Sequence, residues 1–313
     1  MKIGLDIMGG DYAPKATVLG AIAACKALPE GQKLVLIGDK EIAVSILQEN
    51  NFSPDHFEFV HTTEVIGMGE HPAKAVIKKA DSSISVGFQY LKEGKIDAFS
   101  SAGNTGAMLV GSVLSVKTVE GVLRPAMSTN VPKLEGGFGL LVDVGANADC
   151  KPEYLYQFGI LGSIFAECVY HMNNPRVALL NIGEEEEKGN VLCQTAYPLM
   201  KETKQFNFVG NMEGRDLFSD IADVYVADGF TGNVALKMAE SFYVISLKKK
   251  IQDEFFARFN YEQYGGSPIL GVNAPVVVGH GISSPEAIKN MVLLSRDMAQ
   301  SGLIDKIQKA FQS

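Results

Sequence analysis

Short runs of apolar and β-branched residues alternate along the chain with longer segments of helical periodicity. The apolar runs predict strands at 2–7, 33–38, 57–61, 96–100, 139–144, 176–182 and 223–227. The segments between them predict helices near 15–28, 40–50, 72–93, 104–118, 152–172, 189–204 and 231–259, with two more after residue 284. This alternation predicts an α/β fold with a doubly wound sheet and helices on both of its faces.

The chain shows no internal repeat, no low-complexity linker and no shift in composition that would mark a domain boundary. We therefore expect residues 1–313 to form a single α/β catalytic domain, with a helical protruding segment near residues 240–264.

Small, glycine-rich turns follow five of the predicted strands. In open α/β sheets the ligand binds beyond the carboxyl ends of the strands, where loops lead into helices. The turns are MGGD (8–11), SAGNTGA (101–107), GAN (145–147), GEEEEKGN (183–190) and DGFTGN (228–233). Glycines allow the main chain to approach a ligand closely, and hydroxyl and main-chain N–H groups can donate to it. These turns together predict a site for a small oxyanion such as phosphate, although each turn alone could equally be an ordinary strand-to-helix turn with good capping residues.

The composition is that of a folded, soluble protein, with 46% hydrophobic and 20% charged residues. The 32 glycines are about 10% of the chain, against a usual share of about 7%. The formal net charge of −8 argues against nucleic acid as a partner, so an acidic partner would have to meet a local basic patch.

The four cysteines, Cys25, Cys150, Cys168 and Cys193, are spread along the chain without the spacing of a zinc site or a disulfide framework. We expect a reducing, cytoplasmic setting. The chain has no apolar run of 18 residues, so we expect no membrane-spanning helix, and its first residues do not resemble a signal peptide.

The common catalytic fingerprints are missing. The sequence has no GxGxxG after its first strand, no P-loop, no GxSxG serine elbow and no HExxH motif. We therefore expect no metal and no cofactor, and a chemistry that depends on positioning and electrostatic stabilisation.

Three polar residues are candidates for contact with an anion. Lys188 directly follows four glutamates and is the only cation of its loop, so its ammonium could meet phosphate. Asn233 could donate its amide to an oxyanion, or it could cap a helix. His280 lies in a glycine-rich segment and could contact an anionic ligand, or could be an ordinary loop histidine.

The segment from Phe242 to Tyr264 combines an apolar stripe with cations. Its apolar residues at helical spacing are Val244, Leu247, Ile251, Phe255 and Phe259, and its cations are Lys248, Lys249, Lys250 and Arg258. Such a stripe is usually core or a dimer seam. The added cations also allow an interface with acidic lipid or an acidic protein.

A long, ordered set of motifs resembles the PlsX family of bacterial phosphate acyltransferases. The motifs are DIMGGD (6–11), SAGNTGA (101–107), RPA (124–126), DVGAN (143–147), NIGEEEEKGN (181–190), NMEGRD (211–216), DGFTGN (228–233) and YGGSPILGVN (264–273), followed by HG at 280–281. The resemblance runs from residue 1 to about residue 290.

The resemblance implies transfer of a long-chain fatty acyl group from acyl carrier protein to inorganic phosphate. The acyl phosphate would serve a downstream membrane glycerol-3-phosphate acyltransferase in phospholipid (phosphatidic acid) synthesis. The resemblance also implies a three-layer α/β/α fold like that of isocitrate and isopropylmalate dehydrogenases, a homodimer, and peripheral membrane association on the cytoplasmic side.

By motif matching, Lys188 and Asn233 correspond to the family's catalytic pair. The phosphate- and substrate-binding residues that we expect lie in the glycine-rich turns; they are Asp6, Gly9, Gly10, Asp11, Ser101, Gly103, Asn104, Thr105, Gly106, Asp143, Asn147, Asp228, Gly229, Thr231, Gly232 and His280. Lys248, Lys249, Lys250 and Arg258 are the expected contacts to carrier protein or membrane.

Three other functions remain open on the sequence. A decarboxylating, NAD-dependent dehydrogenase would share the implied fold. A phosphate acetyl- or butyryltransferase would use coenzyme A thioesters in place of the carrier protein. A lipid- or anion-binding scaffold with a degenerate site would bind without catalysing.

Overall fold

The computed structural model describes residues 1–312, apart from the side chain of Tyr261. The chain forms two compact units. Unit 1 comprises Met1–Thr118 and Glu262–Gln300, and unit 2 comprises Val119–Tyr261 and the residues from Ser301 onward. Strands and helices alternate in both units, which confirms the predicted α/β class. The single catalytic domain stays a prediction.

The sheet of unit 1 has a parallel core. Its strands are β1 (Lys2–Asp6), β2 (Lys33–Gly38), β3 (Phe57–His61), β4 (Ala98–Ser101), β10 (Ser267–Leu270) and β11 (Val276–Val278). They lie in the order β3-β2-β1-β4-β11-β10, all parallel except for β10, which pairs antiparallel with β11. The apolar residues of β1, β2 and β4 are almost completely buried, as expected for a sheet covered on both faces.

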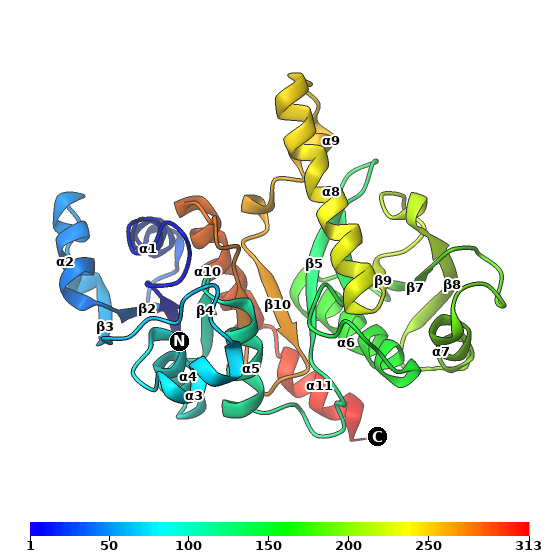
Figure 1. Cartoon of the computed structure of the whole chain (residues 1–313), viewed down its shortest axis with the longest axis horizontal. Coiled ribbons are helices and arrows are strands. Elements are labelled where there is room, and N and C mark those ends of the chain that lie inside the picture. The colour runs from blue at the N-terminus through cyan, green and yellow to red at the C-terminus, as the bar shows by residue number, and fades with distance from the viewer. Residues whose placement is uncertain (313) are drawn as a thin grey trace. The chain divides into compact units, whose positions relative to one another are not determined.

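The helices of unit 1 form two groups, which cover opposite faces of its sheet (Figure 1). One group contains α1 (Lys15–Ala27), α2 (Lys40–Glu49) and α10 (Pro285–Gln300). The other contains α3 (Pro72–Lys78), α4 (Ser83–Lys92) and α5 (Thr105–Ser115). Residues 79–82 separate α3 from α4, because Ser82 begins a new helix by accepting the N–H of Ser85. The predicted helix over 72–93 is therefore two helices.

Unit 2 repeats this architecture with its own strands. They are β5 (Ala126–Pro132), β6 (Phe138–Val142), β7 (Arg176–Asn181), β8 (Asn207–Glu213) and β9 (Val224–Val226), in the order β5-β6-β9-β7-β8. The strands are parallel except for β5, which pairs antiparallel with β6. The helices are α6 (Pro152–Tyr170), α7 (Val191–Lys201), α8 (Gly229–Lys249), α9 (Glu254–Ala257) and α11 (Leu303–Phe311). α6 packs on β6, β7 and β9, whereas α8 begins against β5 and β6.

The prediction of one continuous helix over 231–259 is wrong. α8 ends at Lys249, since Lys250 takes a left-handed conformation with φ of 56°. Asp253 then caps α9 by accepting the N–H of Phe255, so the predicted stripe is divided between two helices. The C-terminal half of α8 extends away from the strands of unit 2, with α9 beside it (Figure 1).

An aromatic cluster holds α9 against α8. The rings of Phe218, Phe242, Phe255 and Phe259 lie edge to face, with centroids 5.0–6.0 Å apart. The other apolar side chains of the segment, Val244, Ile245, Leu247 and Ile251, are about half exposed. The segment therefore has a packed aromatic side and an uncovered aliphatic side. No helix formed by residues 1–312 combines the length and the apolar composition needed to cross a membrane.

An ion-pair network lies at the amino ends of β7 and β9 in unit 2. Lys133, with only 8% of its side chain exposed, binds Asp223 at 2.7 Å and Asp220 at 2.8 Å. Arg176 donates its Nε to the other oxygen of Asp223 at 2.9 Å. Burial would raise the pKa of Asp223, but the hydrogen bonds from Arg176 and Lys133 outweigh it and hold the pKa below its usual range.

Asp223→Asn should lower the free energy of unfolding by about 3 kcal/mol at pH 7, because it leaves the buried Lys133 undercompensated. A depressed pKa stabilises the fold above the unfolded value near pH 4 and loses that effect as the pH falls further. The difference between the two proteins, measured by urea unfolding, should therefore shrink below about pH 4. Glu167→Gln, which removes the partly exposed partner of the half-exposed Lys306, should cost less than about 1 kcal/mol. Equal losses from both substitutions would contradict the prediction.

Candidate functional site

In each unit, the predicted turns follow neighbouring parallel strands and so gather at one edge of a sheet. In unit 1 the turns after β1, β4 and β11 lie together, because these strands are adjacent. In unit 2 the turns after β6, β9 and β7 lie together for the same reason. These are the carboxyl ends of the strands, where open α/β sheets bind their ligands.

The unit 1 edge is built around the buried carboxylate of Asp6. Asp6 accepts the hydroxyl of Ser101 at 2.6 Å and the N–H of Met8 at 2.8 Å. Burial raises its pKa, while these hydrogen bonds act in the opposite direction. A Cβ on Gly9 would lie 2.6 Å from the nitrogen of Gly103, so only glycine allows the two turns to approach this closely. Asp6 and Ser101 thus fix the shape of the turns, and each is a hydrogen-bond partner of the other.

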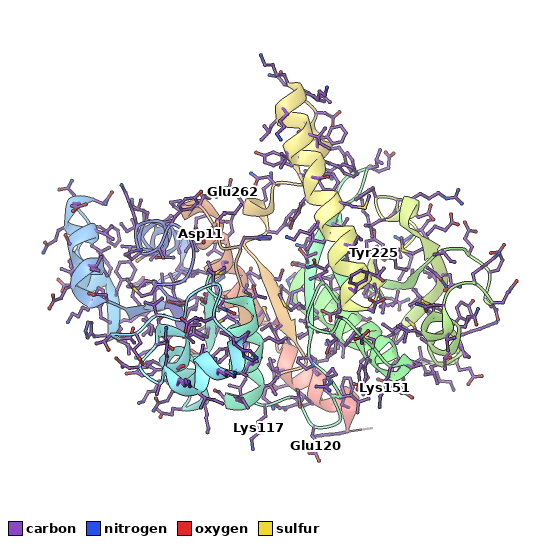
Figure 2. The ribbon with its side chains drawn as sticks, in the orientation of Figure 1. Asp11, Lys117, Glu120, Lys151, Tyr225 and Glu262 are labelled. Atoms are coloured by element: carbon purple, nitrogen blue, oxygen red, sulfur yellow. The ribbon has the colours of Figure 1, made fainter. Side chains whose placement is uncertain are left out.

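The third turn of unit 1 contacts the first through the main chain. Asp11, labelled in Figure 2, donates its N–H to the carbonyl oxygen of Gly281 at 2.7 Å, and Gly10 lies beside it with φ of 109°. His280 is half buried in this turn, and its carbonyl accepts the N–H of Ser283 at 3.0 Å. The structure therefore brings Gly10, Asp11 and His280 to the same edge.

The SAGNTGA turn is a helix cap, as one of the two interpretations held. Asn104 accepts the N–H of Ala107 at 3.0 Å and donates its amide to the carbonyls of Gly67, Met68 and Glu70. Its side chain is thus committed to holding the 67–70 loop. The N–H groups of Thr105 and Gly106 lie in the first helical turn, where they have no intrahelical acceptor and could donate to an anion.

A second buried carboxylate, Asp143, organises the unit 2 edge. It accepts four hydrogen bonds, from the N–H groups of Met127, Ala146 and Asn147 and from the Asn147 amide, at 2.7–3.1 Å. Burial raises its pKa, and the four hydrogen bonds oppose that shift. Asn147 also donates to the carbonyl of Pro125 at 2.8 Å. Asp143 and Asn147 are therefore internally bonded residues that fix the turn.

The DGFTGN turn packs directly on the Asp143 turn. Asp228 caps α8 by accepting the N–H of Thr231 at 2.8 Å and its hydroxyl at 2.7 Å. Gly229 donates its N–H to the carbonyl of Asn147 at 2.7 Å, and Gly232 lies against the main chain of Asp143.

Asn233 lies within α8 and does not cap it, so the capping interpretation is wrong. Its amide donates to the carbonyl of Val144 at 3.0 Å, which holds it at the sheet edge in a half-buried position. This contact uses one of its two amide hydrogens, leaving the other available.

Lys188 is exposed and lies in the loop 183–189 between β7 and α7, which we call the Lys188 loop. Among residues 1–312 its ammonium has no carboxylate at salt-bridge distance, although four glutamates precede it. One of them, Glu186, is instead paired with Lys201 on α7. A solvent-accessible, unpaired cation is available to an anionic ligand.

A pocket of about 220 Å³ lies between the Lys188 loop and the DGFTGN turn. Its lining is Leu155, Leu179, Leu180, Asn181, Ile182, Gly189, Asn190, Cys193, Ala227, Asp228 and Thr231. The volume is below the roughly 300–1,000 Å³ of pockets that bury a drug-sized ligand. The pocket therefore suits a small group, and its lining combines apolar side chains with the polar Asn181, Asn190, Asp228 and Thr231.

The cysteines do not have the environment of a reactive thiolate. Burial raises the pKa of Cys193, which lines the pocket, and raises the pKa of Cys150 to about 12. A thiol with a raised pKa is a poor nucleophile at neutral pH. Residues 1–312 also contain no group of three or more His, Cys, Asp or Glu side chains that could hold a metal ion.

Three of the four predicted partner residues lie at the end of α8 that is remote from the pocket. Lys248, Lys249 and Lys250 are exposed at the C-terminal end of this 21-residue helix, about 30 Å from its first turn at 1.5 Å per residue. Arg258 is half buried and donates to the carbonyls of Lys133, Leu134 and Gly137, so it anchors α9 to unit 2.

Several residues of this edge were not singled out in the sequence. Asn181 and Asn190 line the pocket, and both lie inside the NIGEEEEKGN motif, which drew attention only to its lysine. Gln194 and Asn211, which contact the Lys188 loop, come from elements whose approach to that loop depends on the folded chain.

Solved structures that share this fold include phosphotransacylases. The chain is similar to the EutD phosphotransacetylase from Staphylococcus aureus (TM-score 0.64, 16% identity, 96% of this chain and 94% of the other). It is also similar to a branched-chain phosphotransacylase from Enterococcus faecalis (TM-score 0.65, 16% identity, 96% and 99%). At this level of identity the likeness defines the class of fold alone: an α/β fold shared with phosphotransacylases.

Sequence comparison then identifies the family. A family model described as "Fatty acid synthesis protein" matches residues 1–250. The phosphate acyltransferases of Dictyoglomus turgidum and Syntrophomonas wolfei are 44% and 41% identical, each over 98% of this chain and over 96% and 98% of their own lengths. The chain belongs to the PlsX family of phosphate acyltransferases.

Proposed function

We propose that this protein transfers a long-chain fatty acyl group from acyl carrier protein to inorganic phosphate, giving acyl phosphate for phosphatidic acid synthesis. The observation that carries the proposal is the similarity of the chain to phosphate acyltransferases over almost its whole length. The small pocket between the Lys188 loop and the DGFTGN turn has room for a group of the size of phosphate. Within the α/β class, we assign the three-layer architecture of isocitrate and isopropylmalate dehydrogenases.

The reaction needs no covalent enzyme intermediate. A phosphate oxygen attacks the thioester carbonyl carbon and forms a C–O bond; the tetrahedral intermediate then collapses, the C–S bond breaks, and the thiolate leaves and takes a proton from solvent. The enzyme must hold phosphate about 3–3.5 Å from the carbonyl carbon and stabilise the oxyanion. Lys188 supplies positive charge for the phosphate or the oxyanion, and Asn233 orients one of them with its remaining amide hydrogen.

The expected substrate-binding residues divide into two roles. Asp6, Ser101, Asn104, Asp143 and Asn147 hold the turns through their own hydrogen bonds. Main-chain N–H groups of the glycine-rich turns, including those of Thr105 and Gly106, donate to the substrates.

The C-terminal end of α8 supports the proposed partners. Its lysines provide a basic patch for acidic carrier protein or anionic lipid, and the exposed aliphatic side chains beside them suit peripheral membrane contact or a homodimer seam. We place the enzyme in the cytoplasm, at the membrane surface, where its product would reach a downstream glycerol-3-phosphate acyltransferase.

Simultaneous replacement of Lys248, Lys249 and Lys250 by glutamate should raise the KM for acyl carrier protein about tenfold and leave kcat near its normal value. Each basic residue near an anionic surface contributes about 1 kcal/mol, so binding to vesicles of anionic phospholipid should also fall, as measured by sedimentation. The matched control changes the exposed Lys15, Lys92 and Lys204 to glutamate. If the control raises KM equally, only overall charge matters and the patch is not the docking site.

The decisive assay measures phosphate-dependent release of carrier-protein thiol from long-chain acyl carrier protein. The proposal expects thiol release and acyl phosphate formation in equal amounts. Faster turnover of acetyl or butyryl coenzyme A would identify a short-chain phosphotransacylase. Binding of substrate without thiol release would indicate a scaffold, and reduction of NAD with a hydroxy acid would indicate a dehydrogenase.

A further inference from the structure

The Lys188 loop combines exposed side chains with a fixed main chain. Glu184, Glu185, Glu186, Glu187 and Lys188 all face solvent, and the loop belongs to no strand or helix. A loop of this kind would normally move freely, since few contacts hold it. Its carbonyl groups, however, are bound by side-chain amides that come from three different elements.

Two of these amides come from the elements on either side of the loop. Asn181, at the end of β7, donates its Nδ2 to the carbonyl of Lys188 at 3.1 Å. Gln194, on α7, donates its Nε2 to the carbonyl of Glu187 at 2.7 Å and to that of Gly189 at 3.1 Å. The main chain on both sides of the Lys188 Cα is therefore tied to the framework.

The third amide comes from the neighbouring strand. Asn211 on β8 is only 8% exposed, and its Nδ2 donates to the carbonyl of Glu185 at 2.8 Å. A buried amide is costly unless it is hydrogen-bonded. The Asn211 Oδ1 is buried without a partner among residues 1–312. The hydrogen bond to the carbonyl of Glu185 is therefore the contact that compensates for burial of this amide.

We propose that Asn181, Gln194 and Asn211 form a carbonyl clamp that positions Lys188 for catalysis. The inference rests on the proposed function of Lys188 and deepens it. The clamp binds only main-chain oxygens, so it fixes where the lysine begins and leaves its ammonium available. Displacement of a positioning group by about 1 Å can cost about a hundredfold in rate, so a modest loss of loop order should be visible in turnover.

The first test measures how readily the Lys188 loop opens, by proteolysis and without any activity measurement. Asn181→Leu, Gln194→Met and Asn211→Leu each remove the donor while keeping a similar shape. Glutamyl endopeptidase cleaves after glutamate, so cleavage of the native protein within 184–187 reports local opening. Gln194→Met removes two hydrogen bonds and should accelerate this cleavage about tenfold. The matched control, Gln157→Met, removes the hydrogen bond to the carbonyl of Gly121 and the one from the N–H of Leu123, and should leave cleavage at 184–187 unchanged.

The second test asks whether the clamp acts through Lys188. In the acyl transfer assay, Gln194→Met should lower kcat/KM about tenfold in the wild-type background and cause almost no further loss in a Lys188→Ala background. Unchanged cleavage in all three variants would overturn the clamp. Faster cleavage with unchanged turnover, or full additivity with Lys188→Ala, would overturn its positioning role. If the wild-type protein releases no thiol, the proposed function fails, and the cleavage rates still decide whether the clamp exists.

Discussion

Replacing Lys188 by alanine should lower phosphate-dependent acyl transfer by about 10²- to 10³-fold, the usual effect of removing one group that stabilises an oxyanion. The fold should be almost unaffected, because Lys188 is exposed and forms no salt bridge within residues 1–312. Surface substitutions of this kind change the free energy of unfolding by less than about 0.5 kcal/mol. Steady-state kinetics with varied phosphate, together with urea unfolding, measure both effects.

The kinetic pattern assigns the role of the lysine. If Lys188 binds phosphate equally well before and during the reaction, the KM for phosphate should rise and kcat should hold; if it stabilises the oxyanion, kcat should fall. Lys204→Ala is the control, since it removes another exposed lysine of the same unit from a position outside the Lys188 loop. Lys204→Ala should retain nearly normal turnover. Near-normal turnover in Lys188→Ala would remove this residue from the mechanism.

The sequence predicts most of the parallel core of both units. β1, β2, β6, β7 and β9 are continuous apolar runs, because strands covered on both faces need apolar side chains in both directions. The strands β5, β8, β10 and β11 were missed. β5 contains Ser-Thr-Asn, β8 contains two asparagines and a glycine, and β10 and β11 have only four and three residues. Their pairing, which includes the two antiparallel contacts, depends on partners distant in sequence.

The boundaries at the end of α8 show a different limit. Val244, Leu247, Ile251, Phe255 and Phe259 have helical spacing, but spacing does not reveal that Lys250 adopts a left-handed conformation. The break allows Phe259 to fold back on Phe242, with Phe255 packed against Phe259. Burial of this aromatic cluster outweighs the local preference for one long helix.

The candidate site could be predicted in part from the sequence. The turns could be predicted, since each places glycine and small polar residues after a strand. Which turns meet depends on the strand orders β1-β4-β11 and β6-β9-β7, and these orders do not follow from the sequence of the chain. The amides of Gln194 and Asn211 have no local signal, because their acceptors lie on a different element.

Gly232→Ala should destabilise the protein by about 3 kcal/mol or more. A Cβ at this position would lie 1.9 Å from the carbonyl oxygen of Asp143. Overpacking commonly costs about 1–3 kcal/mol, when side chains can adjust. Here the obstacle is the main chain of a completely buried residue whose carboxylate already accepts four hydrogen bonds. The helix preference of alanine returns at most about 1 kcal/mol, so the clash should dominate.

Gly232→Ala should also reduce turnover in the fraction that remains folded, because relief of the clash must move α8 away from the Asp143 turn and carry Asn233 with it. Gly214→Ala is the matched control in the same unit, since a Cβ there meets nothing within 4 Å. Urea unfolding of both variants, followed by turnover under conditions where each is folded, separates the two effects. Equal stability of the two variants would show that α8 adjusts to a Cβ without cost, and the close packing of these turns would then not be what holds Asn233 at the sheet edge.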